Sequence, residues 1–342
     1  MNKEIDLQNY QIRTDLALEA LDGIKGKKQY QRETFENDKN KITRVFVDED
    51  MSKEIGKKVG NYTTIEFEDI TDYSNKEKVK GIFAKELKEM LSLNQINDEA
   101  SCLIIGLGND KSTPDALGPL VVNNVLVTNP LFEIGENSDG FRKTVALAPG
   151  VMGQTGIETS DLITSVVKCV KPDFVLVVDA LASQSVERLN KTIQMTDTGI
   201  HPGSGIGNKR KEVSKDTINL PVIAIGVPTV VDAVTIVSDT INYMHHKYSY
   251  TKQNYNNPLD KLIGPNFNYL NKSVSLNQED RTKLLGLVGK LSSSEVKQLI
   301  YEVLTPIGYN LMVTPKEVDF IMEKLSDVIG NGINKALHKE VN

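Results

Sequence analysis

Continuous apolar runs that alternate with helix-type segments constrain the fold of this chain more than any other feature of its sequence. The clearest runs are Cys102–Leu107 and Phe174–Val178. Such runs indicate strands buried on both faces, as in a parallel sheet. Alternation of this kind predicts an α/β fold with a largely parallel sheet and a core of about 100–245. Strands are expected near 102–107, 144–148, 173–179, 192–196 and 221–226, and helices near 114–127, 157–170 and 229–243.

Segments before and after this core extend it. Strands are expected near 43–48 and 61–67, followed by a helix near 76–92, because apolar residues recur there at strand and helix spacing. The stretch 247–280 is polar and has few apolar residues, which predicts a long loop. Two capped amphipathic helices are expected within 292–338.

Two helices of the core are expected to begin at threonines. Thr155 precedes Glu158 by three residues, and Thr229 precedes Asp232 by the same spacing. A hydroxyl at the cap with an acid three residues later satisfies free N–H groups of the first turn. The spacing therefore predicts helix starts at Thr155 and Thr229.

Composition excludes several classes of protein. With 40 Lys and Arg against 46 Asp and Glu, the net charge is −6, so nothing favours an overall nucleic-acid-binding surface. The two cysteines, Cys102 and Cys169, are too few for a secreted disulfide scaffold and are expected to be buried thiols. No secretory leader and no 18-residue apolar stretch is present. We therefore expect a cytoplasmic protein without a membrane partner.

Two aspartates lie where apolar strands stop. Asp115 falls in the first turn of an expected helix, after a loop that contains Gly106 and Gly108. Acids are common in first turns because the helix dipole favours negative charge, so a structural role also explains Asp115. Asp179 ends a buried strand, where an acid is either hydrogen-bonded within the structure or exposed in a crevice. Chemistry collects beyond the carboxyl ends of such strands, so we expect an acid/base pair there.

A glycine-rich basic loop is the third candidate site. Gly203, Gly205 and Gly207 alternate with other residues and are followed by Lys209 and Arg210. Such a loop resembles a phosphate nest, but its spacing matches neither the P-loop nor the dinucleotide fingerprint. A loop over a site fits better, with glycines that let the backbone approach an extended substrate.

A metal site remains an alternative. Asp115, Asp179 and His201 together have the ligand types of a carboxylate–imidazole site. No HExxH motif or paired-cysteine spacing supports zinc, and no GxSxG motif supports an acyl-enzyme hydrolase. We therefore expect no cofactor, with a divalent metal as the alternative.

Several long stretches of the chain carry a family resemblance. They are Tyr10–Ala17, Gly106–Asn109 with Thr113–Pro119, Pro149–Gly153 with Thr155–Asp161, Asp179–Ala182, Gly199–Gly205, Asn208–Lys211, Pro228–Ala233 and Asn310–Asp319. In these stretches the sequence resembles the germination protease family, the endopeptidases of spore-forming bacteria that begin to degrade small acid-soluble spore proteins. The resemblance runs nearly from end to end, and its variable parts are 21–60 and 247–290.

The resemblance implies a homotetrameric protease of the spore core, made as a zymogen that removes its own propeptide. The matching bond is Asp15–Leu16, which gives a propeptide of residues 1–15 and a single peptidase domain of 16–342. The implied fold is a doubly wound sheet flanked by helices, similar to hydrogenase-maturation peptidases. The proposed catalytic acids of the family match Asp115 and Asp179, which makes the protein an atypical aspartic peptidase.

Three other functions remain open on the sequence. The first is a metal-dependent peptidase of the hydrogenase-maturation type, whose relatives bind metal through acids and a histidine at similar positions. The second is a nucleotide-binding α/β enzyme that uses the glycine-rich basic loop for phosphate. The third is a module that binds spore proteins without cleaving them.

Overall fold

The computed structural model describes residues 14–22, 32–37, 39–135, 139–201, 211–256, 274, 277–304 and 311–341. The chain forms two compact units. The larger comprises Arg13–Val230 and Thr314–Asn342, and the smaller is built on Val231–Val313. The single peptidase domain expected for 16–342 stays a prediction.

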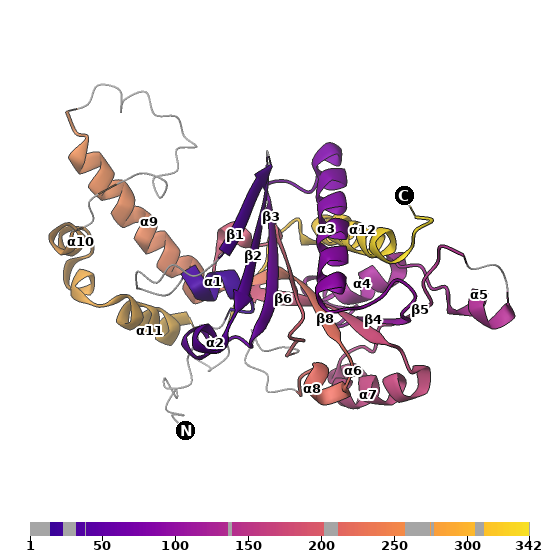
Figure 1. Ribbon diagram of the computed structural model, residues 1–342. Coiled ribbons are helices and arrows are strands. Elements are labelled where there is room, and N and C mark those ends of the chain that lie inside the picture. The colour runs from indigo at the N-terminus through magenta and orange to yellow at the C-terminus, as the bar shows by residue number, and fades with distance from the viewer. Residues whose placement is uncertain are drawn as a thin grey trace. The chain divides into compact units, whose positions relative to one another are not determined.

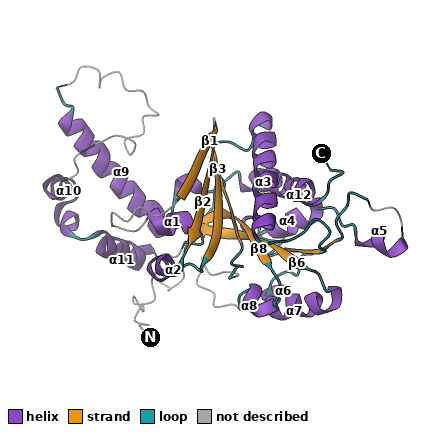
Figure 2. Ribbon diagram, viewed as in Figure 1, coloured by secondary structure: helices purple, strands orange, loops and turns teal. Residues whose placement is uncertain are grey.

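The larger unit contains a sheet with helices around it (Figures 1 and 2). Its strands are β1 (Arg32–Asn37), β2 (Asn40–Val47), β3 (Gly60–Phe67), β4 (Cys102–Gly106), β5 (Thr144–Leu147), β6 (Phe174–Ser183), β7 (Thr192–Thr196) and most of β8 (Val222–Asp232). Its helices are α1 (Ala17–Asp22), α2 (Glu49–Ile55), α3 (Tyr73–Leu93), η2 (Thr113–Asp115), α4 (Leu117–Asn124), α5 (Asn129–Ile134), α6 (Met152–Thr155), α7 (Thr159–Val170), η3 (Val186–Arg188), α8 (Lys215–Ile218) and α12 (Val318–Leu337).

The sheet has the strand order β1-β2-β3-β7-β8-β6-β4-β5. The expected α/β sheet with flanking helices is confirmed, but its parallel part includes β5, β4 and β6. From β1 through β2, β3 and β7 to β8, each strand is antiparallel to its neighbour. The sheet is therefore mixed rather than largely parallel. The short connection between β1 and β2 explains part of this, since neighbours joined by a tight turn must run in opposite directions.

Helices cover both faces of the parallel part. On one face α3, α4 and α12 pack on the alternate side chains Cys102 and Ile104 of β4, and on their counterparts in β6. On the other face α7 packs on Leu103 and Ile105 of β4. Burial on both faces requires apolar side chains at every position, which is why these strands read as unbroken apolar runs. Cys102 is buried as expected, whereas Cys169 of α7 is exposed, because it lies on the outer side of that amphipathic helix.

Two expected helix starts are wrong. Thr155 ends the short helix α6, and α7 begins after Glu158. Thr229 lies inside β8, which continues to Asp232 because it is buried along almost its whole length. The following helix begins at Ala233, and the Asp232 carboxylate accepts the backbone N–H of Val234.

The smaller unit is mainly helical. It contains α9 (Ala233–Gln253), α10 (Gln278–Leu285), η6 (Gly286–Lys290), α11 (Ser293–Leu304) and β9 (Met312–Val313), which pairs with the end of β8. The loop expected over 247–280 is partly wrong, since α9 continues through its first seven residues. In the described part of the chain, no helix combines the length and the apolar character needed to span a bilayer.

A fully buried phenylalanine of the core predicts a clear stability effect. Phe83 of α3 is 0% exposed, and an added Cβ on Gly332 of α12 would lie 2.4 Å from its ring. We expect Phe83→Ala to lower the free energy of unfolding by about 3–5 kcal/mol, because loss of the ring removes buried apolar contacts and leaves a cavity in the core. Urea denaturation measures this change. Leu93→Ala, on the same helix but 57% exposed, is the control and should cost less than about 1 kcal/mol.

Candidate active site

The loop after β4 holds Asp115 by its backbone and its side chain. The backbone N–H of Asn109 donates to Asp115 Oδ2 at 2.9 Å and to its carbonyl oxygen at 3.0 Å. Asp115 donates its own N–H to the carbonyl of Ser112 at 2.8 Å. Gly108 has a φ of +118°, and a Cβ there would lie 1.9 Å from the Asp115 carbonyl oxygen. The loop therefore requires glycine at this position to bring Asp115 back against the end of β4.

The expected helix at 114–127 is divided in two. Residues 113–115 form the 3₁₀ turn η2, and α4 begins only at Leu117. Asp115 consequently lies in a separate turn before the α-helix. The Thr229 hydroxyl of β8 donates to the carbonyl of Pro114 at 2.6 Å, which fixes this turn to the sheet.

Asp179 does not end its strand as expected, because β6 continues to Ser183 and its residues stay largely buried. It lies one residue beyond the end of the pairing of β6 with β4. Val178 is the partner of Gly106, the last residue of β4, and the N–H of Leu107 donates to Val178 O at 2.7 Å. The Asp179 side chain is almost buried, with the residue 5% exposed, and its Oδ1 accepts the N–H of Ala180 at 2.9 Å.

Both acids therefore lie beyond the carboxyl end of β4. The strands β4 and β6 are parallel neighbours, and η2, which carries Asp115, contacts β6, which carries Asp179. In open α/β sheets this edge is where ligands bind and chemistry occurs.

Of the glycine-rich basic loop and the possible metal ligand His201, only His201 is described. His201 is half exposed, and its Nε2 lies 2.8 Å from the Glu212 carboxylate. Gly203, Gly205, Gly207, Lys209 and Arg210 lie outside the described residues. Within the described ranges, no three His, Cys, Asp or Glu side chains come together in a group able to hold a metal ion.

The expected processing bond, Asp15–Leu16, is held on β6 and β7. The Asp15 N–H donates to Ala182 O at 3.2 Å, and the Ala182 N–H donates to Asp15 Oδ2 at 2.9 Å. The Asp15 carbonyl accepts Gln194 Nε2 at 3.2 Å, and Gln194 Oε1 accepts the N–H of Ala17 at 2.7 Å. Leu16 is 0% exposed. Ala182 is three residues after Asp179 on the same strand, so one strand carries a candidate catalytic acid and binds the bond expected to be cut.

Gln194 and Lys57 were not identified from the sequence. Gln194 lies inside the fully buried strand β7, whose sequence alternates polar and apolar residues. The alternation resembles that of a strand with one polar face, so the sequence does not mark Gln194 as a buried amide that needs hydrogen-bond partners. Lys57 Nζ donates to the carbonyl of Thr14 at 2.7 Å. Burial lowers the pKa of the Lys57 ammonium, against the nearby carboxylates of Asp15 and Glu19, which raise it. Nothing in the local sequence pattern distinguishes Lys57 from the other lysines.

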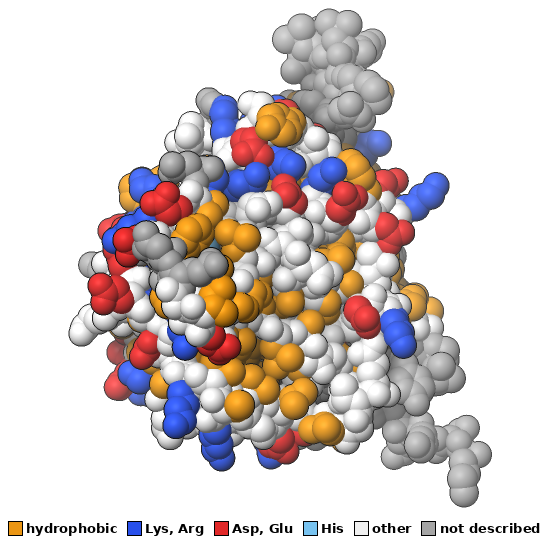
Figure 3. Space-filling view, turned by 90° about the vertical axis from the view of Figure 1, so that its right-hand side faces the viewer, with side chains coloured by type: hydrophobic (Ala, Val, Ile, Leu, Met, Phe, Trp, Pro, Cys, Tyr) orange, Lys and Arg blue, Asp and Glu red, His pale blue; other side chains and the backbone are white. Residues whose placement is uncertain are grey.

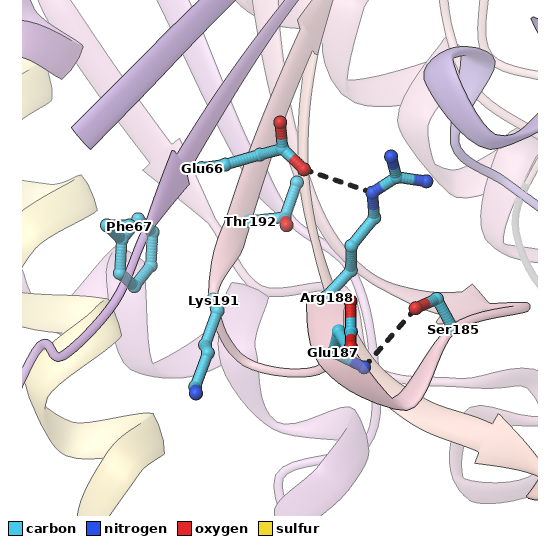
Figure 4. Close-up of a pocket in the computed structure, with 7 residues that line it drawn as sticks. All are labelled: Glu66, Phe67, Ser185, Glu187, Arg188, Lys191 and Thr192. Atoms are coloured by element: carbon cyan, nitrogen blue, oxygen red, sulfur yellow. Dashed lines mark hydrogen bonds and ion pairs between the residues drawn. The ribbon is translucent and has the colours of Figure 1, made fainter. Parts of the chain in front are cut away.

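Two acidic residues of α1, the helix that follows the Asp15–Leu16 bond, hold that helix against β6 and η3. Glu19 of α1 is 7% exposed and accepts the Ser183 hydroxyl at 2.6 Å and the Gln184 N–H at 2.7 Å. Asp22 accepts Arg188 Nη2 at 2.8 Å. Figure 4 shows Arg188 also donating to Glu66, at 3.1 Å, beside a cavity of about 310 Å³. These bonds attach α1 to the end of β6 and to η3.

Known proteins resemble this chain over its whole length. The family model described as germination protease matches residues 6–342. A germination protease of Geobacillus sp. (strain WCH70) is 48% identical over 363 residues, which cover 100% of this chain and 97% of the relative. A germination protease of Bacillus cereus (strain AH187) is 49% identical over 358 residues, with the same coverage.

A solved structure also matches part of the chain. It is a [NiFe] hydrogenase maturation protease, HycI, from Thermococcus kodakarensis KOD1, at 21% identity and a TM-score of 0.27, covering 42% of this chain and 80% of that one. The full-length relatives and the family model, by contrast, agree with each other in name and in the extent of the match. On that agreement, this chain is a peptidase that belongs to the germination protease family.

Proposed function

We propose that this chain is an endopeptidase that begins the degradation of small acid-soluble spore proteins during spore germination. It is made as a zymogen and cuts its own Asp15–Leu16 bond. The observation that carries this proposal is the binding of Asp15 to Ala182, on the strand that also bears Asp179. An acidic residue followed by an aliphatic one is thus bound three residues along β6 from a buried acid.

In this proposal Asp115 and Asp179 are the catalytic pair of an aspartic-type peptidase. Two close carboxylates do not ionise together easily, so one takes a proton from the attacking water and the other keeps its proton and polarises the carbonyl. The water oxygen bonds to the carbonyl carbon, the C–N bond breaks, and the amine of Leu16 receives a proton. Neither a metal nor another cofactor takes part in these steps.

Substrate contacts complete the proposal. The backbone N–H groups of Gly203, Gly205 and Gly207 stabilise the oxyanion, and Lys209 or Arg210 attracts the acid that precedes the cut bond. At Asp15, Gln194 Nε2 already donates to the carbonyl of that bond, which supports a role in polarising it.

Self-cleavage is the direct test. We expect mass spectrometry of the full chain after mild acidification to show a new N-terminus at Leu16, with and without a metal chelator. The Asp115→Asn chain is the matched control and should remain uncut. Cleavage at another bond, or equal cleavage of the Asp115→Asn chain, contradicts the proposal. Loss of cleavage on chelation, restored by one divalent metal, contradicts the metal-free mechanism alone.

The protein is further proposed to be a homotetramer in the cytoplasm of the spore core. Figure 3 shows hydrophobic side chains gathered in the middle of one face, with charged side chains nearer its edges. Exposed apolar residues of the larger unit include Leu126, Val127 and Ile134. Exposed apolar patches rimmed by polar residues favour self-association. Light scattering of the purified chain should give four times the monomer mass.

A further inference from the structure

A single hydroxyl connects the expected new N-terminus to a buried acid. The Leu16 N–H donates to Thr14 Oγ1 at 3.0 Å, and Thr14 Oγ1 donates to Glu19 Oε2. The Leu16 nitrogen and the Glu19 carboxylate are therefore only two hydrogen bonds apart, with one side chain between them. Leu16 is fully buried and Glu19 nearly so.

Cleavage of Asp15–Leu16 changes both of these groups at once. Thr14 leaves with the propeptide, so the Leu16 nitrogen and Glu19 Oε2 each lose the hydroxyl they share. The Leu16 amide also becomes an α-ammonium, which carries a positive charge near neutral pH. A buried charge without a partner is costly, and Glu19 is the acid that shared the Thr14 hydroxyl with the Leu16 nitrogen.

We propose that Glu19 binds the new N-terminal ammonium of Leu16, and that this ion pair forms only after the propeptide is cut. The inference rests on the proposed cleavage at Asp15–Leu16. Glu19 is a positioning residue, because it acts through the strand that bears Asp179. Its carboxylate already accepts Ser183 at the end of β6 and Gln184 just beyond it. The ion pair thus fixes the end of β6 in the processed chain.

Other charged groups surround this pair. Arg188 of η3 has Nη1 3.8 Å from Glu19 Oε1, but its other nitrogens bind Asp22 and Glu66. Asp22 also lies 3.7 Å from Arg32. Lys57 is the competing cation, since it loses Thr14 as its acceptor on cleavage. Burial lowers the pKa of the Lys57 ammonium, against the carboxylate of Glu19, which raises it.

The test uses chains that are made as fusions behind ubiquitin. Removal of the ubiquitin leaves the chosen residue as the N-terminus, so the test does not depend on self-cleavage. A chain starting at Leu16 should fold, because the apolar clusters of the described residues use Ala17 and later residues. Two matched variants accompany it. One carries Glu19→Gln, and the other has one alanine before Leu16, which keeps the ammonium but moves it by about 3.5 Å.

We expect the melting temperature of the Leu16 chain to fall by about 3–6 °C between pH 7 and pH 10, relative to both variants. An ion-paired amine has a pKa raised above its unfolded value of about 8, so its stabilisation is fully present below about pH 8 and is lost as the pH rises through the raised pKa of the folded chain. Asp22→Asn removes another acid of α1, one that bonds Arg188 and not Thr14. This variant should keep the fall in melting temperature between pH 7 and pH 10.

Identical pH curves for the Leu16 chain and the alanine-extended chain overturn the inference, even if Glu19→Gln fails to fold. Melting requires no peptidase activity, so this result is independent of the self-cleavage test. If the full chain fails to cut itself while the melting temperature of the Leu16 chain falls between pH 7 and pH 10 as expected, the proposed self-processing fails and the ion pair stands.

Discussion

Asp115→Asn and Asp179→Asn are each expected to lower kcat for cleavage of an acidic–aliphatic peptide bond by at least about 10²–10⁴-fold. The reason is that an amide neither accepts the proton of the attacking water nor donates one to the carbonyl as an acid does. Both substitutions keep the volume of the side chain. An Asn at position 115 still offers an oxygen to the N–H of Asn109, and one at 179 still accepts from Ala180.

Steady-state kinetics on a peptide that contains the sequence of residues 10–20 measures this effect. Circular dichroism and thermal melting serve as the control, and we expect both variants to fold. Asp161→Asn, at an exposed acid on α7 that pairs with Lys211, should leave kcat unchanged. A folded Asp179→Asn chain that retains most of the wild-type kcat would remove Asp179 from the catalytic pair.

Gly108→Ala is expected to abolish peptidase activity and to destabilise the larger unit by more than about 2 kcal/mol. Alanine at a φ of +118° is strained, and its Cβ would lie 1.9 Å from the carbonyl oxygen of Asp115. Since this contact is with backbone, no side chain is able to move aside. The loop must shift, and Asp115 moves with it.

Gly135→Ala is the control that separates backbone strain at a positive φ from a steric clash of the added Cβ. Gly135 also has a positive φ, +71°, but no atom within 4 Å of an added Cβ. It should cost only about 1–2 kcal/mol and leave kcat intact. Urea denaturation and peptide kinetics on both variants measure the difference. Equal loss of activity in the two variants would show that left-handed strain, and not displacement of Asp115, inactivates the protein.

The parallel part of the fold was predictable because its strands are buried on both faces. Leu103 and Ile104 point to opposite faces of β4 and both are buried, so the run is apolar without interruption. β2 instead alternates buried and exposed positions over much of its length, a pattern that marks a strand but does not state its partner or direction. The antiparallel half of the sheet was therefore missed.

The predictions of helix starts at Thr155 and Thr229 were wrong for a related reason. A capping pattern describes the first turn of a helix only if the chain turns there. At Thr229 the burial of β8 on the sheet continues the strand to Asp232, and the threonine hydroxyl bonds Pro114 instead. Tertiary packing thus overrode a local signal.

By itself the sequence determined the α/β class and placed Asp115 and Asp179 after the apolar runs of β4 and β6, because each depends on short stretches of chain. The Asp15–Leu16 bond is what the family resemblance implies. Only the tertiary structure brought Asp15 to Ala182, Gln194 to the carbonyl of the bond, and Glu19 to the strand of Asp179. These contacts join residues more than 160 positions apart. Local propensity carries no information about such pairs, whose meeting is decided by the order of strands in the sheet.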